Sequence, residues 1–161
     1  MTRPSLVAPR PQEWARRAIE RTTAIHRVLP DVPIEHIGST AVPDLPAKDC
    51  IDLLVGVDAA AIVASTDALA AVGWDVEGAL AHHAWLSWPH RSERSCVVHV
   101  VEDGGRAWRR PIAFRDLLRA DADARRRYLD VKRAAAATSQ GWDDYTARKT
   151  VIVAELLIRD G

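Results

Sequence analysis

The chain of 161 residues is 48% hydrophobic and 27% charged, which is typical of one folded domain and excludes a disordered or low-complexity protein. Its 22 basic and 22 acidic residues balance, so we do not expect nucleic acid as a partner, because general nucleic-acid binders carry a basic excess. No apolar run reaches the roughly 20 residues of a membrane helix. The first residues lack a secretory signal and the two cysteines are too few for a disulfide scaffold, so we expect a cytoplasmic protein with no membrane contact.

The pattern along the chain predicts a short arm and one domain. Residues 1–10 carry two prolines and no periodicity, which indicates a flexible N-terminal arm ahead of a domain at 11–161. In chain order we expect a helix at 12–29, a strand at 34–37, a loop at 41–48, a buried strand at 50–57, a helix at 58–72, strands at 74–76, 85–88 and 96–101, and helices at 107–119, 122–137 and 143–158. Strands occupy the middle of the chain and helices both ends, which favours an α+β domain with helices packed on one face of the sheet.

A carboxylate interrupts the most apolar of these strands. Asp52 lies in the run Cys-Ile-Asp-Leu-Leu-Val-Gly-Val, and an acid in a buried strand is costly unless a cation or a metal ion compensates it. Shortly before it, a predicted strand ends in Gly38-Ser39, which lets the backbone approach a phosphate closely and offers a hydroxyl. Together the two features predict a site for an anion or a metal ion. A purely structural ion pair between Asp52 and Arg115 is the alternative.

A longer motif surrounds these two features. Residues 36–52 have the sequence His-Ile-Gly-Ser-Thr-Ala-Val-Pro-Asp-Leu-Pro-Ala-Lys-Asp-Cys-Ile-Asp, which resembles the hallmark of the GrpB family. Further positions match that family in order: His99–Glu102, Phe114–Arg119, Tyr128, Lys132, Tyr145 and Lys149. The resemblance implies a nucleotidyltransferase-like mixed sheet with helices on one face and at both chain ends. In that superfamily, Gly-Ser holds nucleotide phosphates and two carboxylates on the next strand bind magnesium.

The resemblance also implies an enzyme that transfers a nucleotidyl or phosphoryl group to a small molecule, with a nucleoside triphosphate as a substrate. Asp52 would hold Mg²⁺ and act in catalysis together with His36 and His99. The residues expected to bind the ligand and its phosphates are Gly38, Ser39, Thr40, Lys48 and Arg115.

One position departs from an active nucleotidyltransferase. Leu54 stands where such an enzyme has its second carboxylate, and a magnesium site needs several oxygen ligands. The alternative function is therefore a domain that binds a nucleotide or an anionic metabolite without group transfer. Trp85 and Trp88 are further candidates for the pocket lining, and His83 for its edge. The sequence leaves open the acceptor, the base of the nucleotide and the oligomeric state.

Overall fold

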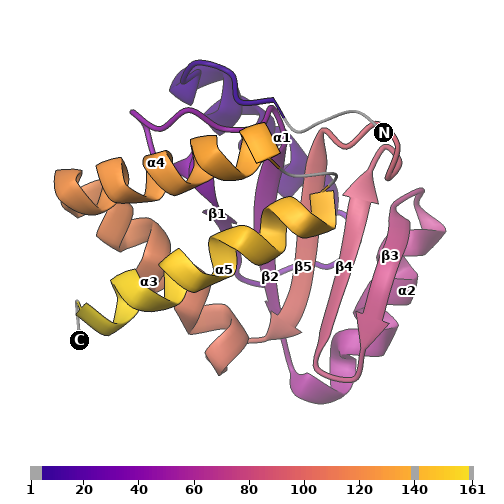
Figure 1. Ribbon diagram of the computed structural model, residues 1–161. Helices are drawn as coiled ribbons and strands as arrows, with labels where there is room; N and C mark the ends of the chain where they lie inside the picture. Colours follow the sequence, from indigo (N-terminus) through magenta and orange to yellow (C-terminus); the bar gives the residue numbers. More distant parts are fainter. Residues whose placement is uncertain (1–4, 139–141, 160–161) are drawn as a thin grey trace.

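The computed structural model describes residues 5–138 and 142–159 (Figure 1). All the helices and strands expected from the sequence are present. They are, in chain order, α1 (Pro11–His26), β1 (Ile34–Ile37), the 3-10 turn η1 (Ser39–Ala41), β2 (Ile51–Val57), the 3-10 turn η2 (Ala59–Ala61), α2 (Ile62–Ala71), β3 (Asp75–Leu80), β4 (His83–Trp88), β5 (Cys96–Glu102), α3 (Arg106–Ala120), α4 (Ala122–Thr138) and α5 (Trp142–Arg159).

The five strands form one mixed sheet in the order β1-β2-β5-β4-β3. The central strands β2 and β5 run parallel, and the other three pairs are antiparallel. Asp52 lies opposite Val97, and His99 lies opposite both Leu54 and Trp85. Because side chains alternate along a strand, these five residues share one face of the sheet.

Helices cover both faces of this sheet. In Figure 1, α1 and α2 lie behind it, while α3, α4 and α5 lie in front. The larger core joins α1 and α2 to one face through residues such as Leu53 and Val55, whereas Leu54 packs on the other face with residues of α3. The α+β class is confirmed, but the expected packing of helices on one face is wrong. The central strand β2 is apolar on both faces, so both need cover.

Two elements differ in extent from the expectation. The strands expected at 74–76 and 85–88 form a hairpin of two six-residue strands, because β4 pairs along the whole of its length with β5. The helix expected from Asp58 begins only at Ile62, after the η2 turn, and the Asp58 side chain makes no capping hydrogen bond. Among residues 5–138 and 142–159, no helix is long and apolar enough to span a bilayer.

The loop between β1 and β2 is held in place by backbone contacts to distant parts of the chain. Arg119 Nε donates to the carbonyl oxygen of Ala41 at 2.9 Å, and Lys132 Nζ donates to that of Pro46 at 2.7 Å. Cations of α3 and α4 thus fix both halves of this loop.

The expected N-terminal arm reaches the same loop. Residues 1–4 lie outside the described part of the chain, but Val7 exchanges two backbone hydrogen bonds with Ala47, at 2.8 and 3.2 Å. The described end of the arm therefore pairs with the segment that leads into β2.

A matched pair of substitutions in α2 tests the packing of this helix on the sheet. Leu69 is fully buried in the core, whereas Val63 is 64% exposed on the same helix. We expect Leu69→Ala to lower the free energy of unfolding by about 2–5 kcal/mol, because it leaves a cavity. Val63→Ala should change it by no more than about 0.5 kcal/mol. Urea titrations measure both, and equal losses would contradict the packing described.

Candidate functional site

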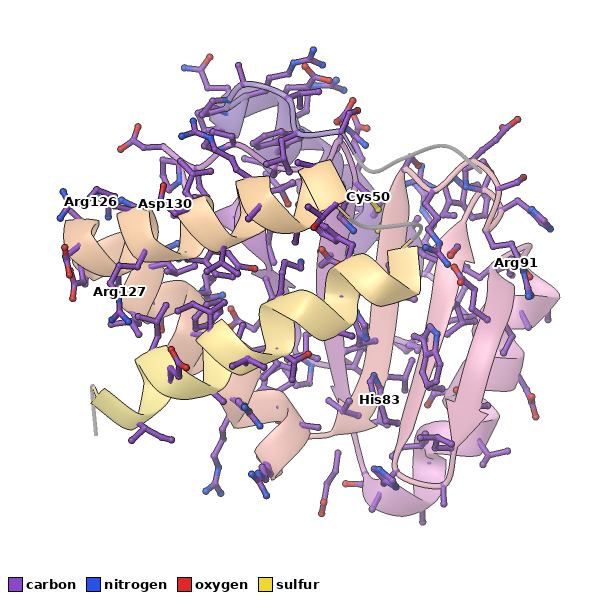
Figure 2. The ribbon with its side chains drawn as sticks, in the orientation of Figure 1. Cys50, His83, Arg91, Arg126, Arg127 and Asp130 are labelled. Atoms are coloured by element: carbon purple, nitrogen blue, oxygen red, sulfur yellow. The ribbon has the colours of Figure 1, made fainter. Side chains whose placement is uncertain are left out.

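A cavity of about 690 Å³ opens between the front face of the sheet and helices α4 and α5. Its lining comes from the turn after β1, the segment that leads into β2, strands β2 to β5, and the two helices. Cys50 and His83, which both line it, lie toward opposite ends of the strands (Figure 2). The cavity therefore extends along the sheet, and one end can differ chemically from the other.

Three ammonium groups converge on one end of this cavity. The chain has 22 lysines and arginines, of which only Lys48, Lys132 and Lys149 are lysines, and all three line the cavity. Lys48 Nζ lies 4.7 Å and Lys149 Nζ 4.5 Å from the ring centre of Tyr145. Lys132 Nζ lies 5.6 Å from the ring centre of Tyr128. An aromatic ring face thus lies beside each of the three lysine ammonium positions.

Burial lowers the pKa of two of these lysines. Burial is the largest cause and repulsion from Lys149 adds to it, while attraction to Asp52 offsets part of the shift; the resulting pKa is about 7 for Lys48 and about 6 for Lys132. Without a bound anion, these groups lose protons near neutral pH although Asp52 is close to them. A bound anion favours their protonated forms, so the cluster is suited to take up an anion together with protons.

Asp52 is the carboxylate that faces the lysines. Its side chain is 36% exposed, and Oδ1 lies 3.8 Å from His99 Nε2. Burial raises its pKa, but the contact with His99 and the charges of Lys48 and Lys149 outweigh burial, so the pKa is lowered overall. Asp52 is therefore ionised at neutral pH and is compensated by cations of the cavity.

Arg115 does not serve as the partner of Asp52. Its guanidinium donates to the carboxylates of Glu35 and Asp116 and, at 3.1 Å, to the carbonyl oxygen of His36. The alternative of a structural Asp52–Arg115 ion pair is therefore wrong. Arg115 connects α3 to β1 instead.

Two histidines extend from Asp52 along the floor of the cavity. His99 contacts Asp52 through Nε2, and its Nδ1 shares a hydrogen bond of 3.0 Å with His83 Nε2. Burial, and to a lesser extent the charge of His99, lower the pKa of His83 to about 4. His83 is therefore neutral at physiological pH, and the chain Asp52–His99–His83 forms a continuous polar line.

The turn after β1 brings backbone into the cavity beside Asp52. Gly38 has φ of +74°, and a Cβ atom there would lie 2.9 Å from Asp52 Oδ2. Glycine is thus required both by the left-handed backbone and by the close approach of the carboxylate. Ser39 follows at the start of η1 and lines the cavity with its neighbours.

His36 supports this turn from the other side of the sheet. It lies opposite Leu53 in the register, so it points away from the face that carries Asp52. Its Nε2 lies 2.8 Å from the hydroxyl oxygen of Thr40, a buried residue of η1. Burial lowers the pKa of His36 to about 4, so it is a neutral hydrogen-bonding partner that holds the turn.

The structure thus collects most of the expected site residues but not all of them. Those that line the cavity are Gly38, Ser39, Thr40, Lys48, Asp52 and His99. His36 and Arg115 lie outside its lining. Lys132 and Lys149 matched the family motif but carried no expected role. The signal that identifies them is composition, because Lys48 is the only other lysine in a chain that otherwise uses arginine.

The donor set of the cavity does not fit a magnesium ion. Leu54, at the position of the second acid, is 1% exposed and packs with Trp108 and Ile112 of α3. Across residues 5–138 and 142–159, no group of three or more His, Cys, Asp or Glu side chains could hold a metal ion. Asp52 instead faces ammonium groups, which compete with a cation for the same carboxylate.

Comparison with known proteins places the chain in a family. Residues 4–159 match the family described as GrpB protein. The chain belongs to the GrpB family. A UPF0157 protein of Deinococcus radiodurans is 41% identical over 155 residues, which cover 96% of this chain and 81% of that protein.

Solved structures agree with this assignment. The conserved protein GrpB from Enterococcus faecalis superposes with a TM-score of 0.79 and 27% identity, and the match covers 96% of this chain and 98% of that one. The Cid1 poly(U) polymerase, solved with MgGTP bound, superposes with a TM-score of 0.55 and 16% identity over 83% of this chain and 45% of the polymerase. At 16% identity this similarity concerns the fold alone, which is nucleotidyltransferase-like.

The buried lysines predict that stability depends on pH. The pKa values of Lys48 and Lys132 are about 7 and about 6 in the folded protein, below the ordinary value of 10.5. At pH values between the folded and the ordinary pKa, these lysines are protonated in the unfolded chain and neutral in the folded protein. The free energy of unfolding therefore rises with pH from about 6 to about 10. In Lys132→Met this rise should be shallower by up to about 1.4 kcal/mol per pH unit.

Urea titrations at pH 6, 7, 8 and 9 measure these slopes. Arg133→Met is the matched control, because it removes a cation from the exposed side of the same helix. Its slope should equal that of the unaltered protein. A Lys132→Met variant with an unchanged slope would contradict the low pKa of Lys132.

Proposed function

We propose that this protein binds a nucleotide or a similar small phosphorylated metabolite in the cavity, without group transfer as its defining activity. The observation that carries the proposal is the convergence of all the lysines of the chain on one end of the cavity. Arginine serves the remaining basic positions. Lysine presents a compact ammonium whose pKa shifts readily on burial, which suits a site that gains charge as a phosphate enters.

The three lysines and Ser39 have different roles in the proposed phosphate site. Lys132 already donates to the carbonyl of Pro46, so it contributes charge and fixes the loop. Lys48 and Lys149 supply contacts to phosphate oxygens, and Ser39 adds a hydroxyl beside Gly38.

Tyr145 supports the same assignment. Its ring is fully buried and lines the cavity, and within the described residues its hydroxyl meets no hydrogen-bond partner. Burial raises the pKa of this phenol, and the charges of Tyr128 and Asp52 raise it further, so it remains an O–H donor. A buried donor without an acceptor is costly, and a ligand oxygen would satisfy it.

Group transfer is the second candidate function. The observation that favours it is the Asp52–His99–His83 line, because a carboxylate that orients a histidine can help to take a proton from an attacking hydroxyl. Against it stand Leu54 and the poor fit to magnesium. We therefore expect binding to proceed without a divalent ion.

Thermal shift and calorimetry with ATP, GTP and CTP, each with and without Mg²⁺, test the binding. A ligand that binds the folded state raises the melting temperature by mass action. We expect at least one nucleotide to do so without Mg²⁺, and Lys149→Met to weaken it at least tenfold. Arg133→Met, which removes the same charge from an exposed position, should bind like the unaltered protein. No shift with any nucleotide under either condition would overturn the proposal.

The variant Asp52→Asn separates a lysine site from a metal site. If lysines hold the phosphate, removal of the one facing carboxylate lessens repulsion, and the affinity should rise several-fold at pH 6, where Lys48 is protonated. If a metal ion held by Asp52 carries the nucleotide, the same change should abolish binding. Calorimetry distinguishes the two, and release of pyrophosphate from a labelled nucleotide triphosphate would show group transfer directly.

A further inference from the structure

The end of the cavity farthest from the lysines is aromatic and apolar. Trp85 of β4 and Leu80 of β3 line it, next to His83. Trp85 is half-buried, and its ring centre lies 5.3 Å from that of His83 at a tilt of 50°. This end therefore presents a large ring rather than charge.

The fold makes room for this ring on the neighbouring strand. Gly78 lies opposite Trp85 in the β3–β4 pair, and a Cβ atom on Gly78 would lie only 2.0 Å from the indole. Any other residue would displace the ring, so glycine lets the indole lie directly over the backbone of β3. The register shift between Val76 and Gly78 marks a bulge at this point, a device that re-aims side chains near sites.

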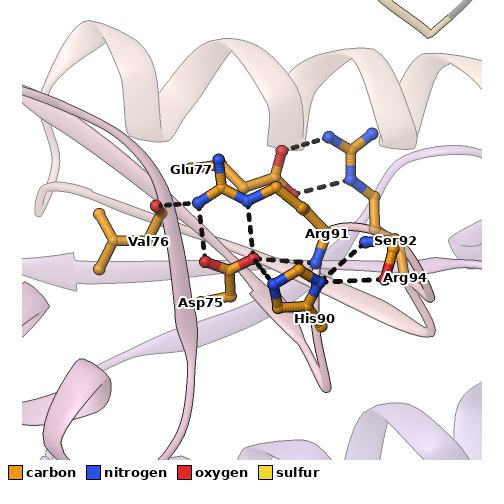
Figure 3. Close-up of polar contacts among 7 residues, drawn as sticks. All are labelled: Asp75, Val76, Glu77, His90, Arg91, Ser92 and Arg94. Atoms are coloured by element: carbon orange, nitrogen blue, oxygen red, sulfur yellow. Dashed lines mark hydrogen bonds and ion pairs between the residues drawn. The ribbon is translucent and has the colours of Figure 1, made fainter.

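The ionic groups of β3 and of the segment after β4 pair with each other. Glu77, the residue within the bulge, forms an ion pair with Arg94 through two hydrogen bonds (Figure 3). Beside it, Arg91 pairs with Asp75 and fixes the segment after β4 (Figure 3). The carboxylate of Glu77, the residue before Gly78, is therefore paired with Arg94, whose charge also acts on Lys48.

The two ends are separated by the length of a small ligand. Asp52 on β2 and Trp85 on β4 lie on either side of β5. Their partners on β5 are two residues apart along that strand. Strand spacing and rise put their Cα atoms roughly 12 Å apart. A ligand with phosphate at the lysines therefore reaches Trp85 with its opposite end.

We propose that Trp85 is the stacking surface for a planar heterocyclic ring, so that the ligand is a nucleotide rather than a sugar phosphate or a free phosphate. The assignment rests on the proposed function, since the lysines anchor the phosphate. Every nucleobase has a π-face that stacks on an aromatic side chain, and an indole supplies a large one. Gly78 and the bulge hold this surface in the cavity.

Calorimetry with two kinds of probe tests the assignment. The four nucleoside 5′-monophosphates carry a base, and ribose 5-phosphate carries the same phosphate and sugar without one. We expect the tightest monophosphate to bind at least tenfold more tightly than ribose 5-phosphate. Trp85→Leu should reduce this ratio to nearly one and leave ribose 5-phosphate unchanged, and Trp85→Phe should restore most of the ratio. Lys149→Met should weaken both probes equally.

Several results would overturn the assignment. Equal affinity of the unaltered protein for both probes would exclude a base subsite and leave the phosphate site intact. Equal weakening of both probes in Trp85→Leu would make Trp85 a structural residue. If Trp85→Leu does not fold, Gly78→Ala, whose Cβ displaces the indole, replaces it, and an unchanged ratio there would overturn the assignment. If neither kind of probe binds although a nucleoside triphosphate does, this assignment fails alone, and if no nucleotide binds, the proposed function fails with it.

Discussion

Three lysines share a partly buried space with the carboxylate of Asp52, and without a bound anion the protein cannot keep all three protonated at neutral pH. Asp52 cannot neutralise all three, so Lys132 is held by a backbone carbonyl and the tyrosine rings cover the cations. Burial and mutual repulsion shift the balance further by lowering pKa values toward neutrality. Repulsion among the protonated lysines lowers the stability of the protein without an anion, and a bound anion relieves it. The affinity for the anion and the stability of the protein therefore both depend on the protonation of the lysines.

The fold is nucleotidyltransferase-like, yet the central strand β2 carries an apolar, packed residue where an active nucleotidyltransferase has its second carboxylate. Leu54 shares the face of Asp52 but is covered by Trp108 and Ile112 of α3. A carboxylate there would be buried against apolar side chains without a partner. The described residues therefore place the turn at Gly38 and Ser39 beside three lysines, in a cavity where Leu54 stands at the position of the second acid.

The loop between β1 and β2, which carries Lys48, is held by three separate helices. Arg119 and Lys132 hold its backbone from α3 and α4, and Asp49 accepts hydrogen bonds from Trp14 and Arg17 of α1. A cluster of like charges needs such anchoring, since repulsion would otherwise move the most mobile of its members away. Contacts from three helices therefore hold the loop that carries Lys48, and Gly78 lies beneath the indole of Trp85.

The sequence by itself determined the order of helices and strands, the buried strand with Asp52, and the turn at Gly38-Ser39, because periodicity and glycine chemistry are local properties. It did not determine on which face a side chain lies, so His36 and Arg115 were expected in the site although strand register and ion pairs place them elsewhere. The partnership of Lys48, Lys132 and Lys149 was decided by tertiary structure, which brings together positions about a hundred residues apart in sequence. The packing of helices on both faces of the sheet was likewise decided by the tertiary structure. The strand β2 buries side chains on both faces, and only the folded chain shows which helices cover each of them.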